Sequence, residues 1–470
     1  MKNIEKLLAG MLVTAALFAC RVGKDYQRPQ VDVPQQYRDV TTADTSSIGD
    51  WEWKKFFADV TLQQLISQGI AYNYDLQLAI KRMGIASEQV KKAKLLQLPQ
   101  LDFQATVSTD YPSKNSLNGL STTSFLGTDH INDYLLGLNL TWEADIWGKL
   151  SRQKESTVAD YLQSYEATKA VQTRLVSDIA QAYFNLIMLD KQLDISYKNL
   201  ALTDSTWQLT RLLRDAGEAT TLAVQQAEVQ KQTIEILIPQ LQQGIELQEN
   251  ALQVLTGNYP GRLNRTVLLD NLNVGDSLPT GIPASILSKR PDVRASEMAI
   301  VSANAQVGVA KANMYPALVI TAGTGLESFK SSNWFNIPNS LFGIAAGSIV
   351  QPVFRRRELK TQYEIAKIQR EQAVIEFKQS ILNAVREVSD ALVSGEKLKE
   401  QQQKASDQVD TLNRAVANAR LLFKSDMANY LEVITAQRNA VLAELNLATI
   451  QRDRLNAKVD LYRSLGGGWK

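Results

Sequence analysis

The sequence has almost none of the residues that build active sites and crosslinks. Its 470 residues include one cysteine, Cys20, and one histidine, His130. A lone cysteine excludes a disulfide within the chain. A lone histidine in an expected exposed loop excludes multi-histidine metal sites and argues against a catalytic triad. No phosphate-binding Walker loop and no G-x-S-x-G element is present, so we expect no enzyme, no catalytic residues, no metal and no cofactor.

Long hydrophobic runs and a dominant charge are also missing. Beyond the N-terminus, no segment has the roughly 18 uninterrupted apolar residues that a transmembrane helix needs. If the chain crosses a membrane, it must therefore do so with strands. The 51 Lys and Arg residues are nearly balanced by 49 Asp and Glu residues, which argues against a nucleic-acid partner.

The N-terminus has the pattern of a secretory signal. Lys2 and Lys6 precede Leu7–Ala19, an uncharged apolar core too short to span a bilayer. Leu17 and Ala19, three residues and one residue before Cys20, match a bacterial lipobox, in which the new N-terminal cysteine receives lipid. We therefore expect cleavage before Cys20 and a covalent lipid on it. The alternative is an ordinary signal peptide whose cysteine is incidental.

Two long proline-free segments predict two very long helices. Ser151–Asp215 and Glu358–Lys424 consist largely of good helix formers. At about 1.5 Å per residue, 60 or more residues make a helix of roughly 90 Å. Apolar residues recur in steps of three and four, the spacing of a coiled coil: Val385, Val388 and Leu392, then Val409, Leu412, Val416, Ala419 and Phe423. A dimeric structural coiled coil explains these segments as well as a channel does.

The sequence also repeats. Arg214–Ala227 aligns without a gap onto Phe423–Ala436, and Ala93–Leu101 resembles Ala310–Leu318. We therefore expect a tandem duplication. Along the chain we expect a signal peptide (1–19), a lipidated extended segment (20–50), a first repeat (51–256), a linker (257–283) and a second repeat (284–470).

Between the helices, the hydrophobic period changes to two, which predicts strands. The four expected strands are near 100–109, 134–142, 317–326 and 341–350. Each is close to the 9 to 11 residues that a tilted strand needs to cross a bilayer. Small and polar residues, namely Gly137, Asn139, Gly323 and Gly347, are expected to face a channel lumen. Aromatic residues near the strand ends favour a membrane location: Tyr134, Trp142, Trp147, Phe342 and Phe354. The alternative is a small soluble sheet with one dry face.

Four strands are too few to close on themselves. In lipid, an open sheet would leave edge amides and carbonyls unpaired at several kcal/mol each. Known membrane barrels begin at about eight strands. If these strands lie in lipid, several chains must therefore pool them.

Several motifs give the chain a family resemblance. They are VGKDYQRP at Val22–Pro29, PQQY at Pro34–Tyr37, WEWKKFFADVTL at Trp51–Leu62, SKRPDVRASE at Ser288–Glu297 and LGGGW at Leu465–Trp469. With the repeated helix–strand–strand–helix order, they resemble the TolC-like outer-membrane factors, in the lipoprotein branch that serves resistance-nodulation-division efflux pumps. The likeness covers essentially the whole mature chain.

The resemblance implies a fold that is mainly α with a membrane β-barrel. Three chains would contribute twelve strands to an outer-membrane barrel, and long antiparallel coiled-coil helices would form an α-barrel in the periplasm. The partners implied are two further copies of the chain, a periplasmic membrane-fusion adaptor, an inner-membrane pump and outer-membrane lipid. The function implied is that of a passive exit duct for drugs or other small molecules.

The resemblance also implies a periplasmic gate. The turns at Arg214–Thr221 and Lys424–Tyr430 would lie at the tip that is farthest from lipid. The carboxylate of the family's constriction maps to Glu432, whereas a family glycine is replaced by Asp426 and another acidic position holds Thr435. Glu432 and Asp426 are therefore the candidate gate residues.

Two other functions remain open at this point. One is an outer-membrane duct for type I protein secretion. The other is a periplasmic coiled-coil lipoprotein with a structural or adaptor role. Ion conductance would distinguish a channel from a soluble rod.

Overall fold

The computed structural model describes residues 22–37, 46–272, 279–425 and 427–470. Cys20, the expected lipid site, and Asp426, one of the two candidate gate residues, lie outside the described residues. The main helices are α2 (Trp53–Phe56), α3 (Val60–Tyr72), α4 (Tyr74–Leu95), α5 (Leu117–Ser121), α6 (Lys149–Asp215), α7 (Thr221–Leu255), α8 (Ile286–Lys289), α9 (Pro291–Ala312), α10 (Glu358–Lys424) and α11 (Tyr430–Ser464). Short helical turns are η1 (Ile48–Asp50), η2 (Thr122–Leu126), η3 (Leu269–Asn271), η4 (Pro283–Ser285) and η5 (Ser331–Asn333).

The chain divides into two compact units, each assembled from separate stretches of sequence. The first unit consists of the described residues of Met1–Pro29, Gly84–Leu162 and Glu297–Glu376. The second consists of those of Gln30–Met83, Gln163–Ser296 and Phe377–Lys470. The first unit holds the sheet, and the second holds the paired ends of the long helices.

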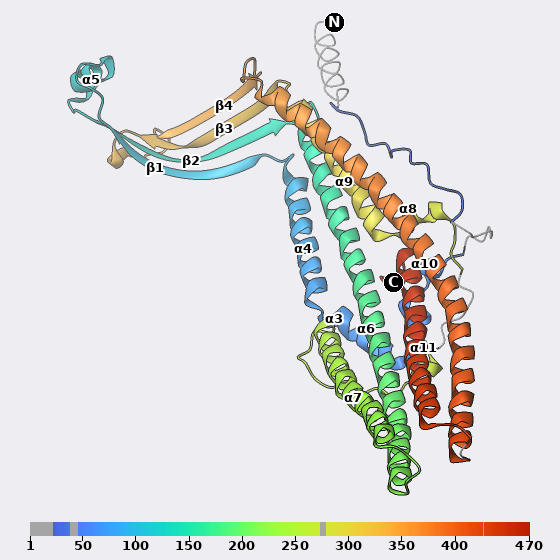
Figure 1. Ribbon diagram of the computed structural model, residues 1–470. Coiled ribbons are helices and arrows are strands. Elements are labelled where there is room, and N and C mark those ends of the chain that lie inside the picture. The colour runs from blue at the N-terminus through green and yellow to red at the C-terminus, as the bar shows by residue number, and fades with distance from the viewer. Residues whose placement is uncertain (1–21, 38–45, 273–278, 426) are drawn as a thin grey trace. The chain divides into compact units, whose positions relative to one another are not determined.

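The four predicted strands are present and form one sheet in the first unit. They are β1 (Gln100–Asp110), β2 (Ile131–Ala144), β3 (Ala317–Ser328) and β4 (Leu341–Val350). All neighbours are antiparallel and the order is β1-β2-β3-β4. Figure 1 shows the four strands side by side, with α5 in the connection between β1 and β2. The strands at the two edges, β1 and β4, each pair on one side only within the described residues.

The two long helices are confirmed, and each has 67 residues. The coiled-coil positions predicted along α10 are buried or half-buried, with Val388 fully buried and Val416 nearly so. In the described part of the chain, no helix combines the length and the apolar character needed to cross a membrane.

The internal repeat is confirmed in the backbone. Helices α6 and α10 are equal in length, and so are α7 and α11 at 35 residues and α4 and α9 at 22. The last helix of each repeat ends in the same way. Gly257 follows α7 with a φ of +78°, and Gly466 follows α11 with a φ of +88°. An L side chain disfavours that conformation, so glycine terminates both helices at the same place.

Candidate functional site

The register of the sheet decides which side chains share a face. Gln104 pairs with Gly137, which pairs with Gly325, while Asp102 pairs with Asn139, which pairs with Gly323. Asn139 donates its amide to Gln104 Oε1 at 3.0 Å. The expected polar face of the first hairpin is therefore continuous across β1, β2 and the start of the next hairpin.

One residue expected on that face lies on the other. Gly347 pairs with Ile320, which pairs with Trp142, so it shares the face of Trp142 and not that of Asn139 and Gly323. Alternation in β4 is weak because small and apolar residues occupy both faces. The sequence pattern could not assign its faces, and only the pairing with β3 does so.

Aromatic residues gather at both ends of the strands. At the loop end, the rings of Tyr134 and Trp334 lie 5.4 Å apart. At the helix end, Trp142 donates to Gln97 O at 3.0 Å, and the ring of Trp147 lies 5.0 Å from that of Tyr315. Aromatic girdles at both interfaces are typical of membrane-spanning strands.

The helical breaks predicted for the tip are present in both repeats. In the first, Thr220 caps α7 by accepting from Ala223 N at 3.2 Å. In the second, Asn429 caps α11 by accepting from Glu432 N at 3.2 Å. Ala223 and Glu432 therefore occupy the same position relative to the cap. Ala223 is buried, whereas Glu432 is exposed.

Glu432 is a carboxylate in the first turn of its helix. Within the described residues it forms no ion pair, and Thr435 is exposed one turn later. A carboxylate in the first turn is stabilised by the helix dipole, so this position suits Glu432 for structural reasons as well. Its role in a gate remains a prediction.

The motif SKRPDVRASE, for which the sequence suggested no physical role, forms an ionic clasp in the second unit. Arg290 is buried and binds Glu387 at 2.9 Å, Asp292 at 2.6 Å and the carbonyl of Ser464 at 3.0 Å. Burial opposes ionisation of Asp292, but the hydrogen bond and charge of Arg290 outweigh it and lower the pKa of Asp292. Arg294 also pairs with Glu166 at 3.0 Å.

The N-terminal motif VGKDYQRP is held in the first unit. Arg28 Nε donates to Glu297 Oε1 at 2.7 Å, and Tyr26 donates to the same oxygen at 3.1 Å. Burial and the Glu297 carboxylate raise the pKa of Tyr26, so the phenol stays a neutral donor. Asp25 binds the buried Arg152 at 2.8 Å. This ordered segment follows the expected lipid site directly in the sequence.

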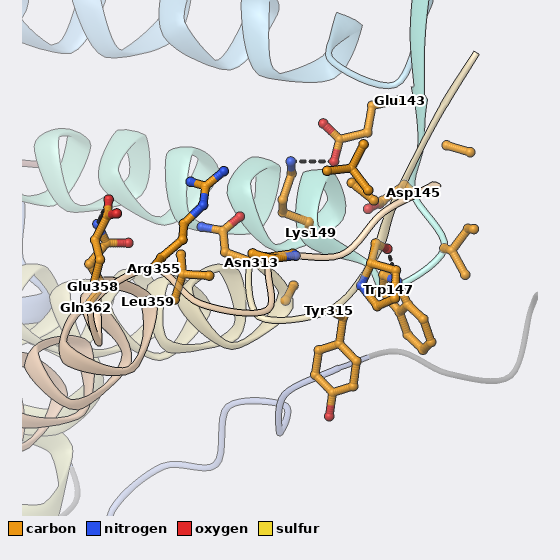
Figure 2. A pocket seen from close by; sticks show the side chains of 17 residues that line it. Glu143, Asp145, Trp147, Lys149, Asn313, Tyr315, Arg355, Glu358, Leu359 and Gln362 are labelled. Carbon is orange, nitrogen blue, oxygen red and sulfur yellow. Dashed lines mark hydrogen bonds and ion pairs between the residues drawn. The ribbon is translucent and has the colours of Figure 1, made fainter. Parts of the chain in front are cut away.

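A cavity of about 350 Å³ lies where β2 and β4 pass into α6 and α10 (Figure 2). Glu143 and Lys149 form an ion pair on one side of it. Asp145 accepts hydrogen bonds from Leu150 N and Ser151 N, both at 2.8 Å, and so starts α6. These contacts are structural, and they use the carboxylates from the β2 side of the cavity.

No group of three or more metal-ligating side chains occurs among the described residues. His130 lies beside β2, where Asp129 binds its ring at 2.9 Å and Tyr111 packs against it at 5.3 Å. The features that remain are the sheet with its aromatic ends, the two helical breaks before α7 and α11, and the ionic clasp around Arg290.

Comparison with known proteins agrees with this architecture. A family model described as outer membrane efflux protein matches residues 65–258 and 282–467, one match in each repeat. The cation efflux system protein CusC of Escherichia coli K12 is 30% identical over 461 residues, with 97% of this chain and 98% of CusC covered. The probable outer membrane lipoprotein SilC of Salmonella typhimurium is 27% identical, with 99% of each chain covered.

Solved structures give the same result. The outer-membrane channel OprN superposes with a TM-score of 0.88 at 26% identity, covering 96% of this chain and all of OprN. The open state of the MtrE outer membrane channel of Neisseria gonorrhoeae superposes with a TM-score of 0.86 at 25% identity, covering 96% of this chain and 99% of MtrE.

Proposed function

Because the chain belongs to the outer membrane efflux protein family, we propose that three copies of it form the outer-membrane exit duct of a tripartite efflux pump. The protein is an outer-membrane efflux component. Among the proteins similar to it, CusC is named as a cation efflux system protein, SilC as a probable outer membrane lipoprotein, and OprN and MtrE as outer-membrane channels. We further propose that the duct is a trimer and that it works with a periplasmic adaptor and an inner-membrane pump.

The open sheet is the observation that supports a trimer. Its edges, β1 and β4, have unpaired backbone groups on their outer sides within the described residues. In lipid these groups must be satisfied, since each unpaired group costs several kcal/mol. Pairing β4 of one copy with β1 of the next satisfies every edge when three copies close a barrel of twelve strands. The aromatic residues at both strand ends support a membrane location for this sheet.

The polar packing of the second unit supports a water-filled duct. Gln437 donates to Thr206 Oγ1 at 3.0 Å, and Gln192 donates to Thr449 Oγ1 at 3.1 Å, so α6 and α11 are bridged by amides and hydroxyls. These hydrogen bonds fix the register of α6 against α11, and the outward-facing surfaces of the two helices stay hydrated. A water-filled duct needs no pocket for its cargo, and cargo selection then belongs to the pump.

The efflux duct is favoured over the other two functions that the sequence left open. Relatives named for efflux match nearly the whole chain, with cation export in the name of CusC and antibiotic export in that of ArpC of Pseudomonas putida. We propose small molecules or cations as cargo on this basis. A deletion strain should become sensitive to such compounds without losing a secreted protein. The channel should also copurify with an inner-membrane pump.

The gate is the part of the proposal that a single substitution can test. Three Glu432 carboxylates, one per copy, would face one another when the tip is closed, and contact with an adaptor would open the second-repeat helix pair. Removing this charge with Glu432→Gln should change the single-channel conductance and reduce the preference for cations in planar bilayers. Raising the salt concentration should shrink the difference, because salt screens the carboxylates.

The matched control is Glu228→Gln. Glu228 is an exposed carboxylate near the start of α7, on the first-repeat side of the tip. It should leave conductance and cation preference unchanged. If Glu432→Gln behaves like Glu228→Gln, Glu432 does not line the constriction.

A further inference from the structure

The corner between β4 and α10 combines strong positive charge with exposed apolar side chains. The segment Val353–Lys360 contains three arginines and one lysine against one glutamate, a net charge of +3. Val353 and Phe354, immediately before the arginines, are 92% and 83% exposed. The corresponding corner of the first repeat, Ala144–Ser151, has one aspartate and one lysine and no net charge. The basic corner is therefore a property of the second repeat alone.

The backbone of this corner is strained where the first repeat is relaxed. Arg356 and Arg357 have φ of +45° and +66°, and they are the two non-glycine residues with positive φ in the described chain. Gly148, which precedes α6 as Arg357 precedes α10, has φ of +73°. Glycine adopts this conformation without a steric penalty, whereas an L side chain does not. Strain that persists at one corner suggests that its side chains have a function.

The arginines have no carboxylate partner in the part of the chain that the structure describes. Within the described residues, the guanidinium groups of Arg355, Arg356 and Arg357 form no ion pair, and all three are exposed. Figure 2 shows Arg355 beside the cavity without a bond to the side chains drawn, while Glu143 is joined to Lys149. The nearby Glu358 accepts a hydrogen bond from Gln362 at 3.4 Å. Three cations are therefore available to a ligand from outside the chain.

We propose that Arg355, Arg356 and Arg357 bind the phosphate groups of anionic phospholipids at the helix-side surface of the outer membrane. This inference rests on the proposed function, which places the sheet in lipid. The corner lies at the end of β4 where Trp147 and Tyr315 also gather. An exposed aromatic beside basic residues suits the boundary between acyl chains and headgroups. Guanidinium groups bind phosphate oxygens in a bidentate manner, and each basic residue near an anionic surface strengthens binding by about fivefold.

The test uses the full-length trimer in vesicles that contain equal parts of phosphatidylcholine and phosphatidylglycerol. The trimer is extracted with little detergent, and its bound lipids of each class are counted by native mass spectrometry. Wild type should retain phosphatidylglycerol in preference to phosphatidylcholine. The triple variant Arg355→Gln, Arg356→Gly, Arg357→Gly should lose that preference by about tenfold or more. Glycine suits the two strained positions, so this variant should still fold and form heat-modifiable trimers.

The control removes three charges elsewhere. Arg370, Lys378 and Lys404 are exposed on α10, and their replacement with glutamine should leave the lipid preference intact. The variant with lysine at positions 355 to 357 keeps the charge without the bidentate geometry and should retain part of the preference.

Three results would overturn the inference. The glutamine and glycine variant could keep its lipid preference. It could instead lose the trimer, which would mean that the arginines pair with a neighbouring copy. Inorganic phosphate could displace phosphatidylglycerol where chloride of equal ionic strength does not, which would indicate a site for free anions.

Conductance in the same lipids separates this inference from the proposed function. A trimer that conducts without lipid preference refutes the inference alone, and one that neither inserts nor conducts refutes the function.

Discussion

The two repeats use different chemistry to join their 22-residue helix, α4 or α9, to their last helix, α7 or α11. In the first repeat, Asn73 precedes α4 and donates its amide to the carbonyl of Leu255, the last residue of α7, at 3.0 Å. In the second, Arg290 precedes α9 and donates to the carbonyl of Ser464, the last residue of α11, also at 3.0 Å. The backbone position of the bond is the same, although one donor is neutral and the other is charged.

The charged donor requires further residues that the neutral one does not. Asn73 completes its role by capping α4, because its side chain accepts from Leu76 N at 3.0 Å. Arg290 is buried and therefore needs carboxylates, which Glu387 and Asp292 supply. Duplication thus preserved where the helices meet, while the side chains at that junction diverged into an amide cap and an ionic clasp.

The largest expected difference between the repeats comes from truncating the two donors. Arg290→Ala leaves Glu387 and Asp292 without their cation and should destabilise the protein by about 3 kcal/mol. Asn73→Ala removes a cap and one hydrogen bond, which costs about 1 to 2 kcal/mol. Thermal unfolding of the detergent-solubilised protein, followed by circular dichroism, measures both. Equal losses of stability would show that the ion pairs add nothing beyond the shared bond.

The residues that follow the last helices, Gly467 and Asn258, should give the next largest difference in stability between the repeats. A Cβ at Gly467 would lie 2.3 Å from the ring of Tyr462, which is buried and stacked on Phe56 at 4.1 Å. Gly467→Ala should therefore destabilise by about 1 to 3 kcal/mol through overpacking. The corresponding residue of the first repeat, Asn258, is exposed. Asn258→Ala should change the melting temperature little, and a comparable drop in both variants would contradict the packing argument.

The corners before the long helices should differ by a smaller amount and in opposite directions. Gly148→Ala places a Cβ at φ of +73° and should cost about 1 kcal/mol. Arg357→Gly relieves the same strain at the second corner, so stability should stay the same or rise by up to about 1 kcal/mol. The melting temperatures of the two variants test this. A loss in Arg357→Gly would mean that the arginine contributes to stability within the chain.

The smallest expected effect is a pH dependence with opposite signs in the two repeats. Glu387 on α10 corresponds to Asp178 on α6, where burial raises the pKa of Asp178 because the charge of Arg174 only partly offsets it. Asp178→Asn should therefore raise the melting temperature at neutral pH, and the gain should vanish as the pH falls below 3.8, the ordinary pKa of an aspartate.

Asp292→Asn should behave in the opposite way. The pKa of Asp292 is lowered, so its ionised form stabilises the fold above pH 3.8, and this contribution is lost as the pH falls through the lowered pKa. The variant should be less stable than wild type at neutral pH and should approach it in acid. Melting curves between neutral pH and about pH 3 separate the two aspartates, and curves of the same sign would refute the assignment.

Much of the fold could be predicted from periodicity. The coiled-coil spacing gave the long helices, and strict alternation gave β1 and β2. In β4, alternation could not show which residues share a face, because small residues lie on both faces, and the prediction for the face of Gly347 was wrong. Glu432 was identified through the family resemblance, but its exposure could not be read from the repeat, because the position that is exposed in α11 is buried as Ala223 in α7.

The sequence alone determined the repeating order of helices and strands, because local periodicity and proline placement act over short distances along the chain. It also indicated that four strands cannot satisfy their own edges in lipid. Tertiary structure decided which residues meet although they lie far apart in the sequence, as Arg28 meets Glu297 and Arg290 meets the carbonyl of Ser464. It also decided that Arg356 and Arg357 adopt positive φ. Such contacts and backbone conformations depend on how distant segments pack, and no local pattern in the sequence specifies them.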